Sequence, residues 1–523
     1  MATKQMLVAI FVSLLLSFAT CQELRSWSER RRSIRAEECR FSSRRSQPTE
    51  RLLSEGGVME FWDEMEEQFR CAGVAAARTV IQPRSLLLPN YQSSPGLVYI
   101  VQGEGLMGIS FPGCPETYSF MSQRRESEWW RREEHLEREV EGDIVRDMHQ
   151  KVHRFQQGDL IAIPAGAAHW CYNDRDQEVI SICVHDLNNQ ANQLDQSLRT
   201  FFLAGGAPLT ALTGQTRRMM GQENLRNIMS AFDPELMAEA FGASTETMQK
   251  MQVQDGRGFI VRAETMRMLR PEGEEEEEYA IVEGEEEIYR RRRGYDYEGT
   301  EAYRRRRMEG GEEAYWRRRG IRRGGCNDNA LEETASDGLE EAICTMKVLH
   351  NMNTRREADV YTRHGGRLNV VNENKLPLLR FLGMSAEKGH LFPNAIYAPH
   401  WELNSHSIVY CTRGEARVQV VGSRGQLVMD EMVREGDMFI TPQYFASAGR
   451  AGRDGFEFVS FKTTSLPMKS SLAGYTSVLR SFPLEVVMNS YLISRTEAHE
   501  MKQVRAQQQQ TYLLSPIVRR RFS

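Results

Sequence analysis

The sequence predicts an all-β protein with flanking helices, built as two β-barrel domains that are each followed by a small helical segment. The first observation is a set of short β-type runs bounded by Gly, Pro, Asn and Asp, such as 179–184 and 417–421. The second is a pattern that occurs twice along the chain. The third is a helical spacing of apolar residues after each set of runs. The length of 523 residues allows two or three compact units.

The repeat is visible in two pairs of segments. Residues 97–103 resemble 407–414, and residues 158–164 resemble 436–442 with identical spacing of Gly, Asp and Pro. The two copies predict a duplicated domain. The first copy is longer because of a stretch rich in Glu and Arg across 121–154, which we expect to be a surface insertion between two strands, helical or disordered.

Helical segments are expected at equivalent places after each barrel. Residues 224–241 carry apolar side chains at spacings of three and four, and Ser244 is expected to cap a second helix. The ranges 483–491 and 494–503 repeat this arrangement, with Ser494 as the cap. Apolar faces of such short helices pack either on the core or against a neighbouring subunit.

The amino terminus predicts a route through the secretory system. Residues 1–21 read as a signal peptide, with a basic Lys4, an apolar stretch and small residues before Gln22. A membrane anchor is the alternative, but the apolar stretch is shorter than the roughly 20 residues that span a bilayer. The mature protein should be soluble in a compartment where disulfides persist, so its cysteines are candidates for structural bridges.

The charge pattern argues against binding of nucleic acid or an anionic membrane by the chain as a whole. The 67 basic and 72 acidic residues give a net charge of −5. Nine of the basic residues are lysine and 58 are arginine, the side chain richest in nitrogen. Residues 271–329 hold acidic runs followed by arginine runs, which predicts a mobile, protease-accessible linker. An RNA-binding segment is the alternative, but the acidic runs would neutralise it.

One motif in the first copy resembles the second conserved motif of the cupin family. It consists of Gly158, Pro164, Gly166, His169 and Asn173 at the family's spacing. In this pattern Gly158 leads into a strand, Pro164 and Gly166 set the next turn, and His169 points into the barrel. The resemblance implies two cupin domains, which are jelly-roll β-barrels, in one chain.

A fuller resemblance links the chain to the legumin-type 11S seed storage globulins. It rests on the segments 37–41, 54–58, 69–74, 86–91, 99–103, 111–118, 337–344, 395–401, 417–421 and 471–474. The resemblance implies a seed storage protein, a nitrogen and amino-acid reserve that passes through the endoplasmic reticulum to the protein storage vacuole. It divides the chain into an acidic chain at 37–270, the linker 271–329, a basic chain at 330–505 and a flexible tail at 506–523.

The same resemblance implies pairings and partners. Cys39 and Cys71 would form a disulfide within the acidic chain, and Cys114 and Cys344 would join the two chains. The state of Cys171, Cys183, Cys326 and Cys411 stays open, with buried free thiols expected at the first two. The family implies a homotrimer of the precursor and a hexamer after cleavage by an asparaginyl endopeptidase.

The cleavage site departs from the family pattern. The family is cut between Asn and Gly, seven residues before the bridging cysteine, but here Asp337 precedes Gly338 at that place. Asn329 followed by Ala330 stands eight residues earlier, at the end of the linker. A pocket that reads the asparagine amide disfavours aspartate, and a protease engages extended backbone readily. We therefore predict cleavage after Asn329, with Asp337 as the alternative.

The rival class is a metal-dependent cupin enzyme, an oxidase, dioxygenase or decarboxylase. Such enzymes use two His and a Glu from the first cupin motif together with the His of the second. In the first copy the Glu position is Gly96, and the two His positions fall on Pro89 and Tyr91 or on Asn90 and Gln92. In the second copy the four positions are His400, Glu402, Ser407 and Ser447.

We therefore expect no catalytic residue, metal or cofactor, and a structural role for His169. The chain also lacks a GxSxG elbow, a P-loop and a GxGxxG motif after a strand. A sugar-binding or defence protein that uses a barrel mouth is a third class, and nothing in the sequence favours it over storage.

Overall fold

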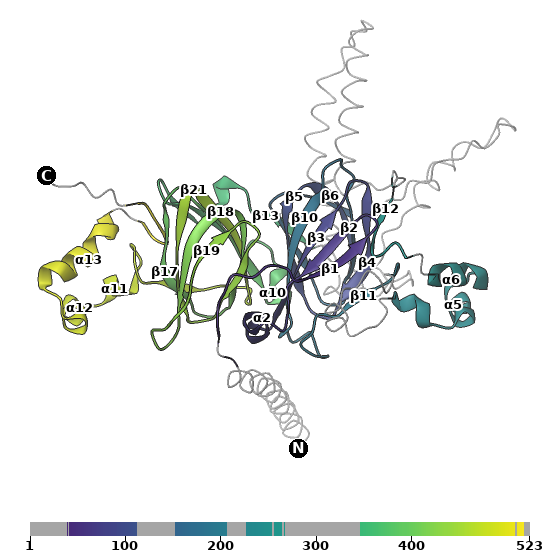
Figure 1. Cartoon of the computed structure of the whole chain (residues 1–523), viewed down its shortest axis with the longest axis horizontal. Helices are drawn as coiled ribbons and strands as arrows, with labels where there is room; N and C mark the ends of the chain where they lie inside the picture. The colour runs from purple at the N-terminus through teal and green to yellow at the C-terminus, as the bar shows by residue number, and fades with distance from the viewer. Residues whose placement is uncertain are drawn as a thin grey trace, which may run out of the picture. The chain divides into compact units, whose positions relative to one another are not determined.

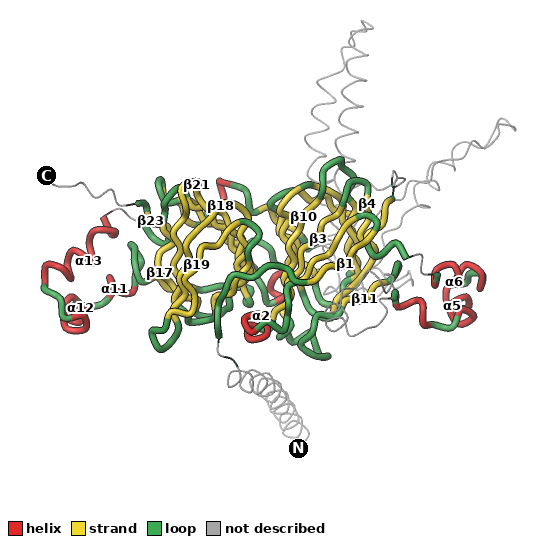
Figure 2. Tube along the Cα trace, in the orientation of Figure 1, coloured by secondary structure: helices red, strands yellow, loops and turns green. Residues whose placement is uncertain are grey.

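The computed structural model describes residues 39, 41–111, 152–206, 226–253, 256–263, 266, 346–507 and 510–516. Within these residues two antiparallel β-barrels are each followed by short helices, as Figures 1 and 2 show. The predicted fold class is therefore confirmed. The signal peptide, the linker and nearly all of the insertion lie outside the described residues.

The first barrel consists of two sheets with apolar side chains between them. One sheet has the order β1-β2-β3-β10-β5-β8-β13, and the other has the order β11-β4-β9-β6-β7 with β12 beside β4. The strands are β1 (Glu50–Ser54), β2 (Gly57–Phe61), β3 (Val74–Ile81), β4 (Ser85–Gln92), β5 (Gly96–Gln102), β6 (Glu104–Ser110), β7 (Val152–Gln156), β8 (Asp159–Ile163), β9 (Ala168–Tyr172), β10 (Val179–Asp186), β11 (Thr200–Phe202), β12 (Ile260–Arg262) and β13 (Leu349–Asn351).

The second barrel repeats this plan with two long strands that bend through both layers. Strand β18 pairs with β19, β20 and β21, and its register with β21 shifts at two places, which marks bulges. The strands are β14 (Val360–Thr362), β15 (Gly366–Val371), β16 (Ser385–Leu391), β17 (Ile396–Glu402), β18 (Ser407–Val421), β19 (Leu427–Arg434), β20 (Met438–Thr441), β21 (Ala446–Lys462), β22 (Lys469–Ser471) and β23 (Leu513–Leu514).

Segments from each half of the chain contact the other half's barrel. Strand β13 follows the linker in sequence, yet it pairs with β8 of the first barrel. Helix α2 (Glu67–Ala72) lies near β20, where the Ile440 backbone N–H donates to Gln68 Oε1 at 3.2 Å. Ser43 Oγ donates to the Ile440 carbonyl oxygen at 2.7 Å. The two barrels therefore share strand pairing and buried hydrogen bonds.

The helical segment after the first barrel is divided by a proline. The sequence predicts one apolar stripe across 224–241, whereas the structure has a 3₁₀ helix, η3 (Ile228–Ala231), and then α5 (Pro234–Phe241). Pro234 has no N–H for a helical bond, so a new helix begins there, with Asp233 accepting from the N–H groups of Glu235 and Leu236. Helix α6 (Thr245–Gln252) follows and is capped by Ser244, as predicted.

The helices after the second barrel include both predicted ones, which the structure places at 484–491 and 495–507, and a short helix at 478–481 that the sequence did not predict. They are α11 (Val478–Ser481), α12 (Leu484–Tyr491) and α13 (Arg495–Gln507). Ser494 begins α13 with a reciprocal cap, because Glu497 N–H donates to Ser494 Oγ while the Ser494 N–H donates to the Glu497 carboxylate. Among the described residues no helix is long and apolar enough to cross a membrane.

One part of the expected flexible tail belongs to the second barrel. Within 506–523, Leu513 and Leu514 form β23 and pair with Tyr397 and Ile396 of β17. The two leucines are 0% and 4% exposed. The prediction of a tail throughout 506–523 is therefore wrong at these residues, because two adjacent leucines gain more by closing the sheet edge than by staying in water.

Replacing Leu513 by Ala should destabilise the protein by about 2–4 kcal/mol, since it removes a fully buried side chain and leaves a cavity. Chemical denaturation of the purified chain measures this loss. The matched control is Leu194→Ala, at a loop side chain that is 59% exposed and lies outside the helical segments, and it should change stability by less than about 0.5 kcal/mol. Equal stability of the two variants would mean that β23 does not hold the barrel.

Candidate functional site

The residues of the cupin motif shape the turns before and after strands β8 and β9 of the first barrel. Gly158 precedes β8 with a φ of +91°, and a Cβ there would lie 2.1 Å from Asn353 Nδ2, so only glycine fits. Pro164 follows the strand, and Gly166 takes a φ of +76° before β9. Asn173 Nδ2 donates to the carbonyl oxygens of Ile81 and Gln177, which fixes the loop after β9. These contacts are structural.

His169 lies inside the first barrel, as the motif predicts. Its side chain is 4% exposed and lines a cavity of about 80 Å³. Its Nδ1 donates to the Ala167 carbonyl oxygen at 3.2 Å, which leaves Nε2 as an acceptor. Burial lowers the pKa of His169, so the ring is neutral at ordinary pH.

The other positions expected of a metal site in this barrel carry no charge. Asn90 and Gln92 of β4 are the pair that lines the cavity, and Asn90 stands opposite His169 in the strand register. The Glu position is Gly96, and a Cβ there would lie 2.6 Å from His185 Cε1. The His185 ring therefore occupies the space that a larger residue at position 96 would need.

His185 is a second buried histidine that sequence reasoning missed. It is 1% exposed, and its Nε2 lies 3.0 Å from Cys183 Sγ. Burial lowers its pKa to about 4. The alternation of side chains along β10 puts Cys183 and His185 on one face, so the period-two pattern could have indicated both.

In the second barrel an ion pair takes the place of metal ligands. Glu402 of β17 and Lys462 of β21 are 3% and 2% exposed and lie 2.5 Å apart. Lys462 also donates to Ser407 Oγ at 2.8 Å, which uses the expected Glu position as a hydrogen-bond acceptor. Glu402, the neighbour that the sequence offered to His400, is therefore held by a lysine.

A second ion pair joins the buried Glu387 to Lys469, whose side chain is 14% exposed. Tyr397 donates to Glu387 Oε1 at 2.6 Å, and the His400 ring stacks on Tyr397 with 4.2 Å between ring centres. Burial alone would raise the pKa of Glu387, but the charges of Lys469 and Lys462 lower it to about 2. Burial, aided by the charge of Lys469, lowers the pKa of His400 to about 4.

The metal that many cupins hold does not fit the residues of either barrel. His169 has Asn90, Gln92 and Gly96 at the companion positions, and His400 has Glu402, which is bound to Lys462. Within the described part of the chain no group of three or more His, Cys, Asp or Glu side chains could hold a metal ion. We therefore derive no metal chemistry for this protein.

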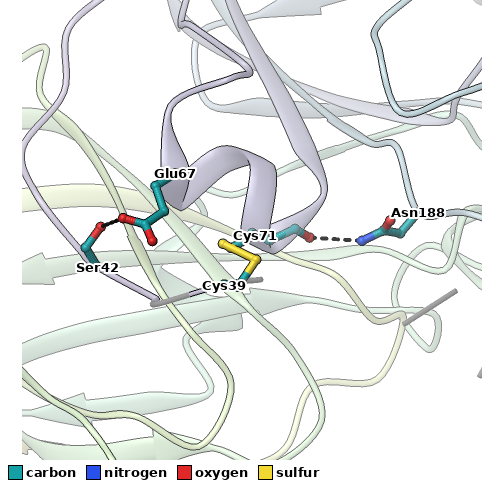
Figure 3. The surroundings of a disulfide bond; sticks show 6 residues. Cys39, Ser42, Glu67, Cys71 and Asn188 are labelled. Atoms are coloured by element: carbon teal, nitrogen blue, oxygen red, sulfur yellow. Dashed lines mark hydrogen bonds between the residues drawn. A yellow bond between two sulfur atoms is a disulfide. The ribbon is translucent and has the colours of Figure 1, made fainter. Parts of the chain in front are cut away.

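The disulfide implied for the acidic chain is present. Cys39 bonds to Cys71 of α2, with 5.6 Å between their Cα atoms (Figure 3). Beside it, Ser42 Oγ donates to Glu67 at 2.9 Å, and Asn188 Nδ2 donates to the carbonyl oxygen of Ala72 at 3.3 Å. The bridge thus anchors the start of the described chain to α2.

The other cysteines of the described chain, Cys171, Cys183 and Cys411, are free thiols. Burial raises the pKa of Cys171 to about 12 and raises those of Cys183 and Cys411 as well, so the thiols stay protonated. The remaining predicted sites lie outside the described residues, namely Cys114, Cys344, Cys326, Asn329, Ala330, Asp337 and Gly338.

Comparison with known proteins places both barrels in one family. A family model described as Cupin matches residues 44–209 and 350–499, so the protein is a bicupin. The 11S globulin seed storage protein 2 of Sesamum indicum is 44% identical over 99% of this chain and 100% of its own length. The crystal structure of the coconut allergen cocosin is 38% identical, with a TM-score of 0.68, and covers 91% of this chain and 99% of that chain.

A recombinant pro-11S globulin of pumpkin is also similar in structure, with 32% identity, a TM-score of 0.68, and coverage of 92% of this chain and 100% of that chain. Taken with the sesame relative, these matches span nearly the whole chain. The chain therefore belongs to the 11S globulin seed storage proteins.

The second barrel departs from the first at the turn between β20 and β21, which corresponds to the turn between β8 and β9 of the first barrel. Tyr444 stands where the first barrel has Gly166, and the two backbone N–H groups make equivalent bonds to the carbonyl oxygens of Glu402 and Gln92. Tyr444 has a φ of +67°, and its side chain is 67% exposed. A left-handed conformation costs a non-glycine residue about 1–2 kcal/mol, so the turn is strained.

The variant Tyr444→Gly should stabilise the protein by about 1 kcal/mol, because it relieves this strain and loses few contacts. The matched variant is Gly166→Ala, where an added Cβ meets nothing within 4 Å but the φ is +76°. It should destabilise by about 1 kcal/mol through the backbone alone. Chemical denaturation compares both with the parent chain, and a less stable Tyr444→Gly variant would contradict the argument.

Proposed function

We propose that this chain is a nitrogen and amino-acid reserve that accumulates as an oligomer in protein storage vacuoles and is cut there into disulfide-linked acidic and basic chains. The observation that carries the proposal is the state of the two barrel interiors. The positions that would bind a metal in an enzyme are neutral in one barrel and tied into ion pairs in the other. The alternative of a metal-dependent oxidase or decarboxylase lacks its ligands in both.

The electrostatics of the second barrel suit an acidic vacuole. The pKa of Glu387 is lowered to about 2 from an ordinary value of 4.5. A carboxyl whose pKa is lowered by folding stabilises the folded state above its unfolded pKa, and this stabilisation is lost as the pH falls from about 4.5 toward 2. A compartment that stays above pH 4.5 therefore leaves this contribution intact.

The helical segments support assembly into a ring. They present apolar side chains that are about half exposed or more in the single chain, namely Phe232, Leu236, Phe241, Tyr491 and Leu492. Two such surfaces stand at equivalent places in the repeat, one after each barrel, so one subunit's segment can pack on the next subunit's in a head-to-tail contact. Contacts of that kind close a cyclic trimer, and two trimers of cut chains would stack into a hexamer.

Light scattering of the uncut precursor tests the assembly. The parent should be a trimer, and Leu236→Glu should shift it toward monomer, because the variant puts a charge on an apolar face that is 58% exposed in the single chain. Leu427→Glu is the matched control, at a strand residue that is 53% exposed, and it should leave the trimer intact. A monomeric parent would overturn the proposed assembly.

The fold explains how the two chains would stay together after the cut. Strand β13 belongs to the basic chain, yet it pairs with β8 in the acidic chain's barrel. A cut between residues 271 and 345 therefore leaves main-chain hydrogen bonds across the two products. The disulfide proposed between Cys114 and Cys344 would add a covalent link to this pairing.

Amino-terminal sequencing of the basic chain, made by an asparaginyl endopeptidase from the purified precursor, tests the cleavage site. We expect Ala330 as the first residue, because Asn329 supplies the side-chain amide that Asp337 lacks. Asn329→Gln should remove this cut, and Asp337→Asn should add a second product that begins at Gly338. A parent product that begins at Gly338 would show that the family's register prevails over side-chain identity.

A further inference from the structure

The first barrel encloses a cavity that its counterpart has partly filled. The cavity measures about 80 Å³ in the first barrel and about 50 Å³ in the second. The strand registers match, because His185 pairs with Gly96 just as Lys462 pairs with Ser407. The first barrel therefore has a glycine where the second has a serine.

A neighbouring strand shows the same reduction in size. Ala77 pairs with Cys183 in the first barrel, and Glu387 pairs with Ser460 at the corresponding place in the second. The counterpart of Glu387 in the first barrel is therefore the smaller Ala77, and the counterpart of Lys462 is the neutral His185. The larger cavity thus lies in the barrel with the smaller side chain at this position, Ala77, which lines it.

The walls of the cavity are mainly apolar, and a few polar residues from two adjacent strands also line it. Leu87, Ile100, Met107, Phe155, Ile161 and Val179 are among the residues that line it. Asn90, Gln92 and His169 line it as well, and they come from the adjacent strands β4 and β9. An apolar pocket with a few polar groups is the usual form of a small-molecule site.

Two of the polar groups that line this space offer a hydrogen-bond acceptor to a ligand, namely His169 and Gln92. His169 Nδ1 is engaged with the Ala167 carbonyl oxygen, so Nε2 can only accept. Gln92 Oε1 is buried and has no hydrogen-bond partner among the described residues. A buried acceptor without a partner costs about 1–3 kcal/mol, and a ligand that donates one hydrogen bond would relieve that cost.

The interior carries no positive charge to hold an anion. The described residues that line the cavity include neither Lys nor Arg. Burial lowers the pKa values of His169 and His185, so both rings are neutral. A carboxylate in this cavity would be a buried charge without a partner, which is strongly unfavourable.

We propose that this cavity binds a small neutral molecule with an apolar body and one hydroxyl or N–H group, which donates to Gln92 Oε1 or His169 Nε2. A cavity of about 150 Å³ takes the six-carbon ring of benzene, so one of about 80 Å³ suits a ligand that is smaller than benzene. The site is separate from the storage role, and its failure would leave that role unchanged.

Three probes with five non-hydrogen atoms each separate the contributions, namely pyrrole, furan and propionate. Pyrrole and furan have the same ring shape, but only pyrrole donates a hydrogen bond, and propionate carries a negative charge. Saturation-transfer difference NMR on the full-length assembled protein measures their binding. Pyrrole should bind about tenfold more tightly than furan, as one net hydrogen bond of about 1.4 kcal/mol implies, and propionate should not bind.

Two variants locate the binding. Gln92→Leu removes an acceptor at similar volume, and it should lower the affinity for pyrrole by up to about tenfold while leaving furan binding unchanged or stronger. Ala77→Val narrows the cavity, and it should weaken both ligands at least fivefold. The matched control is Ala448→Val, the same change at a residue that lines the second barrel's cavity, and it should leave pyrrole binding as in the parent.

The outcomes decide the proposal. Equal affinity for pyrrole and furan in the parent would overturn the role of the acceptors, and binding of propionate would overturn the neutral interior. Pyrrole binding that survives Ala77→Val but is lost in Ala448→Val would place the site in the other barrel and contradict the proposal. If Ala77→Val fails to fold, the parent and Gln92→Leu measurements still decide it.

Discussion

The buried ion pairs of the second barrel are the constraint on which its interior depends. Lys462 and Glu402 are almost fully enclosed, and Glu387 and Lys469 lie beside them with Tyr397 between the strands. Charges in such a place are tolerated only when each has a partner, because the cost of leaving water is several kcal/mol per ion. The network therefore fixes how β16, β17, β18 and β21 meet.

The first barrel has uncharged residues where the second barrel has paired charges. Its corresponding positions hold Gly96, Ala77 and His185, and the histidine is neutral because burial lowers its pKa to about 4. No ion pair is then needed, and a small cavity remains. The charges at these positions are therefore paired in the second barrel and absent from the first.

Local sequence signals predict much of this fold. The duplicated turns, the caps at Ser244 and Ser494 and the inward position of His169 all follow from spacing that a single strand, turn or helix imposes. The positions around His169 and His400 could also be counted from the motif. These features depend on residues that are close in sequence and not on contacts between distant segments.

Contacts between remote segments are the part that the sequence could not supply. Lys462 meets Glu402 from another strand 60 residues away, and β13 pairs across the linker with β8. The buried leucines of β23 close a sheet edge from beyond the last helix. The helix break at Pro234 is a different case, because its signal is local. The prediction of one stripe followed the apolar spacing, although a proline marks the start of a new helix.

The unfolding free energy of a double-mutant cycle at Lys462 and Glu402 tests the central claim most directly. Lys462→Met leaves a buried carboxylate without its partner and should cost about 3–5 kcal/mol. Adding Glu402→Leu to that variant should recover most of the loss, because the remaining charge is gone. A single variant as stable as the parent, or a double variant no more stable than the single one, would contradict the claim that this pair holds the second barrel together.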